Sequence, residues 1–141
     1  MSLLRRLIRN IMDRLAQIKS NRDTGTAHLK LGRLGEDLAV NALKERGYRI
    51  AERNAKIEKH EVDVIAVDGE TLVFIEVKTR SSHEYGPPMS AITPKRIARL
   101  KKAATLYTMK KKIKNVSIRF DVVTVDFADG KREVEVVKNA F

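Results

Sequence analysis

Residues 61–78 read EVDVIAVDGETLVFIEVK, and this stretch decides the fold. Polar and apolar side chains alternate over Glu61–Val67, and Thr71–Lys78 is a second, more apolar run. Asp68-Gly69 between them is a dipeptide typical of tight hairpin turns. The stretch therefore predicts two antiparallel strands. The second strand has apolar residues on both sides, as expected of a central strand that is covered on both faces.

Two carboxylates and a lysine lie on this predicted hairpin. Side chains two residues apart share one face of a strand, so Glu61 lies beside Asp63, and Glu76 lies beside Lys78. Counting outward from the turn brings Asp63 and Glu76 to one end of the hairpin. Carboxylates that converge there repel each other unless a cation binds or one of them takes up a proton.

A carboxylate pair followed by a lysine is what metal-assisted phosphodiester hydrolysis requires. The acids hold a cation that polarises the phosphate, and the lysine steers water or stabilises developing negative charge. The alternative interpretation of Glu76 and Lys78 is an exposed cross-strand ion pair. Their apolar neighbours Leu72, Phe74 and Ile75 weaken that alternative.

The flanking segments predict an α/β domain around the hairpin. Residues 29–46 have helical apolar spacing and end at Gly47, a favourable residue after a helix. Thr93 and Pro94 suit the start of a second helix, which we expect to run to about residue 112. Further strands are expected at Tyr48–Glu52, Arg119–Asp126 and Glu133–Lys138. This order predicts one mixed sheet with helices packed on it.

Glu36 is a further candidate site residue. On a helical wheel it falls on the flank of the apolar arc of residues 29–46, whereas Asp37 points to solvent. An acid on a buried flank needs a partner or a purpose.

The composition limits the chemistry of any site. The chain has 141 residues, the size of one domain with a self-sufficient core. It has no Cys, which excludes disulfides, Cys-ligated zinc, iron–sulfur clusters and thiol nucleophiles. Its three histidines are too far apart in sequence for a zinc pair on one helix face. Any metal must be held by carboxylates, which favours Mg²⁺ or Mn²⁺.

The charge points to a polyanionic partner. Lys and Arg number 29 against 18 Asp and Glu, a net charge of +11, which suits nucleic acid or an anionic membrane surface. Residues 95–114 carry nine basic residues and no acid, and such a helix favours contact with a phosphate backbone over a merely solvated face. The candidate nucleic-acid-binding residues are Lys95, Arg99, Lys102 and Lys110, together with Arg80.

Residues 1–26 form a segment of their own. Residues 1–19 predict a basic amphipathic helix, and 21–26 a polar linker to an α/β domain at 27–141. The longest apolar run in the helix is two residues, which rules out a transmembrane span or secretory core there, and we expect a cytoplasmic protein. Four roles for the helix stay open: packing on its own domain, docking on a partner chain (a second copy in a homodimer included), lying on a membrane surface, or acting as a transit peptide.

Several segments resemble the bacterial YraN-like family, also called UPF0102. They span roughly residues 31–126 and are GRLGEDLA (32–39), Gly47-Tyr48 with Asn54, EVDVIA (61–66), VFIEVKTR (73–80) and RFDVV (119–123). The family is assigned to the restriction-endonuclease-like PD-(D/E)xK superfamily. The resemblance therefore implies a mixed central sheet flanked by helices.

The resemblance also implies a site. It would comprise Asp63, Glu76 and Lys78, with Glu36 as an extra acidic ligand, direct or through water. Two positions depart from the family pattern. His60 stands where the family usually has Gly and adds a bulky group at the mouth of the site, and Lys56 stands where an Arg is common.

Together these observations predict a Mg²⁺- or Mn²⁺-dependent nuclease acting on DNA or a structured nucleic acid. In that interpretation Glu36, Asp63 and Glu76 hold the metal, and Lys78 positions or activates the attacking water. The alternative is a non-catalytic nucleic-acid-binding module of the same fold. A third hypothesis is a membrane-surface or complex-assembly factor that acts through residues 1–19.

Overall fold

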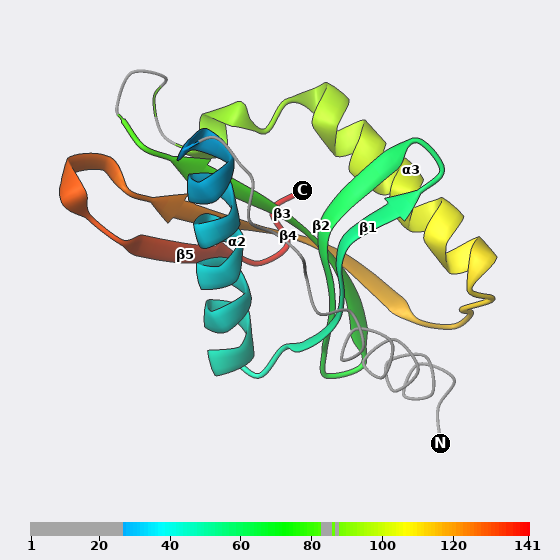
Figure 1. Cartoon of the computed structure of the whole chain (residues 1–141). Coiled ribbons are helices and arrows are strands. Elements are labelled where there is room, and N and C mark those ends of the chain that lie inside the picture. Colours follow the sequence, from blue (N-terminus) through cyan, green and yellow to red (C-terminus); the bar gives the residue numbers. More distant parts are fainter. Residues whose placement is uncertain (1–26, 83–85, 87) are drawn as a thin grey trace.

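A computed structural model describes residues 27–82, 86 and 88–141. The N-terminal helix expected within residues 1–26 lies outside these described residues. The elements follow one another as α2 (Ala27–Glu45), β1 (Arg49–Ile57), β2 (His60–Asp68), β3 (Thr71–Arg80), η1 (Pro88–Ala91), α3 (Pro94–Lys110), β4 (Ser117–Asp126), η2 (Ala128–Gly130) and β5 (Glu133–Val137) (Figure 1).

The strands form one mixed sheet in the order β1-β2-β3-β4-β5. The pairs β1–β2, β2–β3 and β4–β5 are antiparallel, whereas β3 and β4 run parallel. The predicted hairpin is confirmed, because β2 turns into β3 around Gly69, with Asp68 paired to Thr71. The expected position of β3 at the centre of the sheet is also confirmed. The chain thus has the predicted α/β fold, a mixed sheet flanked by helices.

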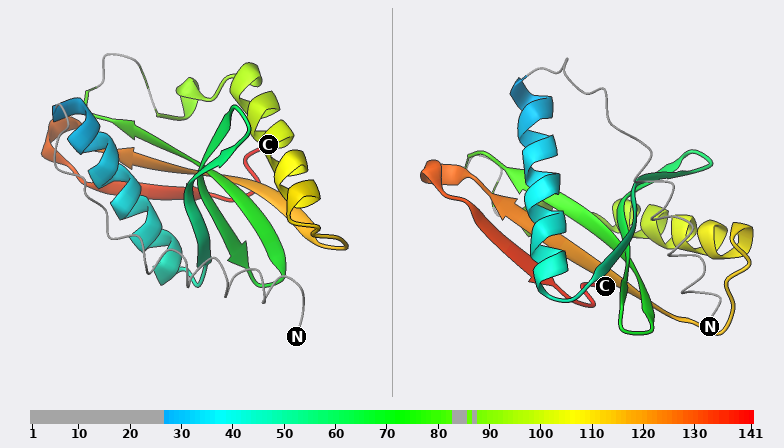
Figure 2. Two further views of the ribbon diagram at one scale, coloured as in Figure 1. Left: turned by 45° about the vertical axis from the view of Figure 1, so that its right-hand side comes forward. Right: turned by 60° about the horizontal axis from the view of Figure 1, so that its bottom comes forward.

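The two helices cover different parts of the sheet and complete two apolar cores (Figure 2). On one face, Leu100 and Tyr107 of α3 pack with Phe74 of β3. On the other face, Leu43 of α2 packs with Ile75, the next residue of β3. Successive residues of β3 thus enter opposite cores, which is why this strand reads as a continuous apolar run.

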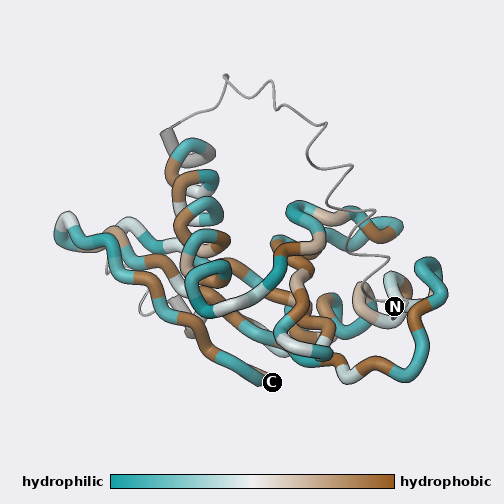
Figure 3. The backbone as a smooth tube through the Cα atoms, turned by 90° about the horizontal axis from the view of Figure 1, so that it is seen from below, coloured by the Kyte–Doolittle hydropathy of each residue, from teal (hydrophilic) through white to brown (hydrophobic). Residues whose placement is uncertain are grey.

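Both helices begin and end close to the predicted residues. The Thr93 side chain accepts a hydrogen bond from the Arg96 N–H at 3.2 Å, which caps α3, and Pro94 occupies its first turn. Gly47 follows α2 with a φ of +87°, a conformation that glycine adopts without strain. Apolar and polar stretches alternate along the helices, as amphipathic helices require (Figure 3). No helix in the described part of the chain is long and apolar enough to cross a membrane.

β1 is longer than predicted. Its expected range was Tyr48–Glu52, but the strand continues to Ile57, with a register shift between Ile50 and Glu52. The second half of the strand contains several polar residues, so the spacing of apolar residues did not predict it as part of a strand. Two of them, Arg53 and Asn54, bind acids of α2 and so have a structural reason to be polar.

Candidate active site

The β2–β3 ladder ends at the pair of Val64 and Ile75. Beyond this pair β3 continues to pair with β4, whereas β2 separates from β3. The next residues, Asp63 and Glu76, therefore lie at a fork between the two strands. The Asp63 carboxylate accepts a hydrogen bond from the Val77 N–H of β3 at 2.8 Å. Its side chain bridges the strands at the point where their backbone pairing stops.

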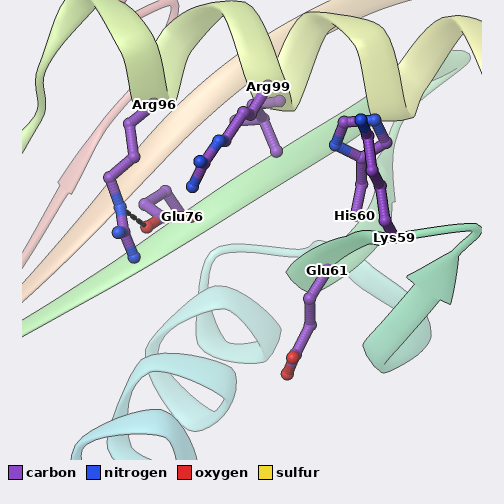
Figure 4. A pocket seen from close by; sticks show the side chains of 7 residues that line it. Lys59, His60, Glu61, Glu76, Arg96 and Arg99 are labelled. Atoms are coloured by element: carbon purple, nitrogen blue, oxygen red, sulfur yellow. Dashed lines mark hydrogen bonds and ion pairs between the residues drawn. The ribbon is translucent and has the colours of Figure 1, made fainter.

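Glu76 is a nearly buried acid with two cationic neighbours. The residue is only 8% exposed, and its Oε1 lies 3.3 Å from the Lys78 Nζ and 2.8 Å from the Arg96 Nε of α3. Figure 4 shows Arg96 extending from α3 toward Glu76. The lysine two residues along the strand thus meets Glu76 on one face, and an arginine from a distant segment joins them.

Glu36 faces inward, as its place on the helical wheel predicts. Its side chain is 16% exposed, against 58% for the neighbouring Asp37. The Glu36 Oε1 accepts hydrogen bonds from the Asn54 Nδ2 at 2.8 Å and the Arg53 Nε at 3.3 Å. Arg53 also binds Asp37, with its Nη2 at 2.6 Å from Oδ1. β1 therefore fixes the orientation of both Glu36 and Asp37.

Two local features of the backbone place Glu36. Gly35 is buried against β3, and a Cβ atom there would overlap the Thr79 side chain, so the glycine lets α2 approach the sheet closely. Asn54 has a φ of +48°, in the left-handed region that asparagine tolerates better than most residues. The close approach of α2 and the turned backbone of β1 bring the Asn54 amide to the Glu36 carboxylate.

The acids at the fork interact electrostatically. Burial raises the pKa of Asp63 to about 7, with further upward contributions from the charges of Glu76 and Glu36. The hydrogen bond from Val77 and the charge of Lys78 lower the pKa only in part. Folding therefore favours the protonated form of Asp63, one of the two responses expected of converging carboxylates.

Two adjoining hollows open at the fork. One, of about 450 Å³, lies between α2 and the strands, and the polar residues that line it include Glu36, Asn54, Glu61, Asp63 and Lys78. The other, of about 490 Å³, is lined by Lys59, His60, Glu61, Glu76, Arg96, Arg99 and Leu100 (Figure 4). Glu61 lines both, so the two hollows adjoin at Glu61, and one reaches Asp63 while the other reaches Glu76.

The side chains at the fork suit a hard cation in chemistry but not as a preassembled cage. Carboxylate oxygens are the ligands that Mg²⁺ and Mn²⁺ prefer. Within residues 27–82, 86 and 88–141, however, no group of three His, Cys, Asp or Glu side chains is arranged to hold a metal ion. Glu76 contacts Lys78 and Arg96 instead, and Glu36 contacts Arg53.

The predicted nucleic-acid-binding residues lie in different environments. Lys95, Arg99, Lys102 and Lys110 are all exposed on α3, but only Arg99 lines a hollow at the fork. Lys110 is in the last turn of α3, at the opposite end of the helix from Arg96. The Arg80 guanidinium binds Asp126 at 2.6 Å and the Gly86 carbonyl at 2.9 Å, so it joins the ends of β3 and β4.

Sequence reasoning missed Arg96 and Arg53 as partners of the site acids. For Arg96 a signal was present, because it lies four residues before the buried Leu100 and therefore on the flank of the apolar stripe of α3. The same argument identified Glu36. For Arg53 no comparable signal exists, since its role depends on where α2 crosses β1.

Known proteins are similar to this chain over the segment that contains the residues of the fork. The family model described as "Uncharacterised protein family UPF0102" matches residues 35–125. The UPF0102 protein of Syntrophus aciditrophicus is 41% identical over 116 residues, covering 82% of this chain and 91% of that protein. The UPF0102 protein of Caldicellulosiruptor saccharolyticus is 45% identical over 115 residues, covering 79% of this chain and 97% of that protein. The resemblance is thus confirmed over the segment that contains Glu36, Asp63, Glu76 and Lys78, and the chain belongs to the family UPF0102.

Proposed function

We propose that this chain is a divalent-metal-dependent nuclease that hydrolyses phosphodiester bonds in DNA or a structured nucleic acid. The convergence of Asp63, Glu76 and Lys78 at the fork of β2 and β3 carries the proposal. The net charge of +11 supports a polyanionic substrate, and Arg99 brings part of this charge to the hollow beside Glu76.

Asp63 and Glu76 would hold Mg²⁺ or Mn²⁺, with Glu36 as a further ligand, direct or through water. Such an ion polarises a phosphate oxygen and lowers the pKa of bound water. To take part, Glu76 must exchange a cationic partner. Arg96 is the partner free to leave, because its side chain is 49% exposed and extends from a surface helix.

Lys78 would position the attacking water or donate a hydrogen bond to a phosphate oxygen. Its ammonium has donors and no acceptor, so it is not a metal ligand. Its side chain is 17% exposed and is held 3.3 Å from Glu76, so its charge is fixed beside the reacting groups and poorly screened by water.

One observation favours a second candidate, a non-catalytic nucleic-acid-binding module. Glu76 already has two cationic neighbours, Lys78 and Arg96, and therefore needs no metal to be stable in its buried position. In this alternative the acids stabilise the fork, and the basic residues of α3 bind phosphates.

A cleavage assay separates the two candidates. The full chain is incubated with supercoiled plasmid, single-stranded DNA and branched DNA, each with Mn²⁺, with Mg²⁺ and with a chelator. The site variant is Asp63→Asn/Glu76→Gln, and the matched control is Glu45→Gln/Glu70→Gln, which neutralises two exposed acids. The nuclease requires cleavage with metal by the wild type and the control, and none by the site variant.

Two results would contradict the nuclease. One is equal cleavage by wild type and site variant, and the other is no cleavage of any substrate by folded wild-type protein. A thermal melt adds an independent readout, because a metal that binds only the folded state raises its melting temperature. Mn²⁺ should stabilise the wild type and the control, but not the site variant.

A further inference from the structure

A basic cleft lies between the β1–β2 hairpin and α3. It is the hollow of about 490 Å³ beside Glu76, and we call it the hairpin cleft. Lys59 and His60, where β1 turns into β2, line one wall, and Arg96 and Arg99 of α3 line the other (Figure 4). The proposed cleavage step gives no role to Lys59 on the hairpin wall. Its positive charge is therefore a reason to look for a further anionic ligand in this cleft.

Two of these cations have no acidic partner. Arg96 binds Glu76, but neither Lys59 nor Arg99 forms an ion pair or side-chain hydrogen bond within the described part of the chain. By contrast, Arg53, Arg80 and Arg119 all bind carboxylates. Glu61 also lines the cleft, and Glu76 is already matched by Lys78 and Arg96. Cations on two facing walls repel each other, and an anionic ligand between them removes that repulsion.

The size of the cleft selects among nucleic acids. A volume of about 490 Å³ is that of a pocket for one small molecule, so it admits about one or two nucleotides. A whole duplex is too large to be enclosed in this volume, because its major groove alone is about 12 Å wide. Of the residues that line the cleft, only His60 has an aromatic ring, so base stacking contributes little and phosphate contacts dominate.

We propose that the hairpin cleft binds the phosphates of a single strand of nucleic acid, a free end or an unpaired branch, and leads that strand to Glu76. This inference deepens the proposed function and rests on it for the fate of the bound strand. Lys59 and Arg99 grip phosphates from opposite walls. Arg96, at the inner end, lies where it can pass from the Glu76 carboxylate to an incoming phosphate.

Fluorescence anisotropy of the full chain tests this inference. The probes are a short labelled oligodeoxythymidylate, an oligouridylate and a blunt duplex of the same length, all with chelator so that no strand is cut. The cleft variant is Lys59→Gln/Arg99→Gln. The matched control is Lys101→Gln/Arg132→Gln, which also removes one Lys and one Arg, both exposed and outside the cleft. Circular dichroism establishes that each variant is folded.

We expect the wild type to bind at least one single strand more tightly than the duplex. The cleft variant should lose about tenfold or more of that affinity, and the slope of log affinity against log salt should fall by about 1.4, since each phosphate contact on a single strand contributes about 0.7. The control should change less than about twofold, because its charges act only at long range. Arg99→Lys, which keeps the charge, should retain most of the binding.

Three results would overturn the inference: equal losses in the cleft variant and the control, a duplex bound at least as tightly as the better-bound of the two single strands, or a loss confined to a Lys95→Gln/Lys102→Gln variant. Failure of the proposed function is a separate result. Tight single-strand binding through the cleft without any metal-dependent cleavage would refute the nuclease and leave the cleft. Metal-dependent cleavage of single strands at an unchanged rate in the cleft variant would refute the cleft alone.

Discussion

At the scale of single residues, the proposed nuclease assigns different roles to the two cations that contact Glu76. Lys78 and Arg96 contact the same oxygen of Glu76, yet they come from different elements and differ in exposure. Lys78 is fixed on β3 with 17% of its side chain exposed, whereas Arg96 is 49% exposed. If the fork is the proposed nuclease site, the more enclosed charge is the one expected to act on the transition state, because water screens it least.

Lys78→Ala should therefore reduce cleavage by about 100-fold or more, the usual loss when a positioned electrostatic stabiliser is removed. Metal binding should persist or strengthen, since a nearby positive charge is lost, and this is measured as the rise in melting temperature with Mn²⁺. Nucleic-acid affinity should change little, because 28 of the 29 basic residues remain. Lys78→Met keeps the apolar stem and controls for lost packing. Full-rate cleavage by either variant would show that the mechanism does not use Lys78.

At the scale of elements, the sequence predicts best what local chemistry determines. The hairpin of β2 and β3 follows from alternation and the Asp68-Gly69 turn, and both helices follow from apolar spacing and their end residues. The position of Asp63 next to Glu76 needs only the hairpin register. Pairings such as Arg96 with Glu76 depend on how α3 lies across the sheet, which no local pattern specifies.

The packing of α2 on β3 is another contact that depends on how elements lie across the sheet and that no local pattern specifies. The wheel places Glu36 on an inward flank, but the approach of the helix depends on Gly35, which has no side chain to hold it away from Thr79. Gly32, one turn earlier, is exposed and has open space around its Cβ position. Two glycines of one helix thus differ in what a methyl group would meet.

Gly35→Ala should destabilise the fold by about 1–3 kcal/mol through overpacking against Thr79, and should reduce cleavage by displacing Glu36. Gly32→Ala is the control and should stabilise the fold by up to about 1 kcal/mol, because alanine favours the helix. Urea denaturation measures both changes. Thr79→Ala should restore part of the stability lost in Gly35→Ala. Equal effects of the two glycine substitutions would show that the close approach is unimportant.

At the scale of the whole molecule, two acids, Asp121 and Asp63, respond to folding in opposite ways. Asp121 is fully buried, and burial alone would raise its pKa. Hydrogen bonds from Arg119, the Asn139 N–H and the Tyr48 hydroxyl outweigh that effect and hold the pKa below its usual value. This network joins β4 to the start of β1 and to the C-terminal residues. Asp63, in contrast, has a raised pKa. The ionised form of Asp121 therefore stabilises the fold, whereas the ionised form of Asp63 destabilises it.

The stability of the metal-free protein should therefore depend on pH in two opposite ways. The folded state keeps a proton on Asp63 up to about pH 7, whereas the unfolded chain loses it near 3.8, so the free energy of unfolding should fall as pH rises between these values. For Asp121 the folded pKa is the lower one, so its contribution is present above about pH 4 and is lost as the pH falls further. Urea denaturation with chelator, repeated from pH 3 to 8, measures both.

Asp63→Asn should be more stable than wild type at pH 8, with a difference that shrinks toward pH 4. Asp121→Asn should be less stable at neutral pH and lose less on acidification. If Asp63→Asn were instead less stable than wild type at pH 8, Asp63 would be a stabilising anion, and the raised pKa of this acid would be wrong.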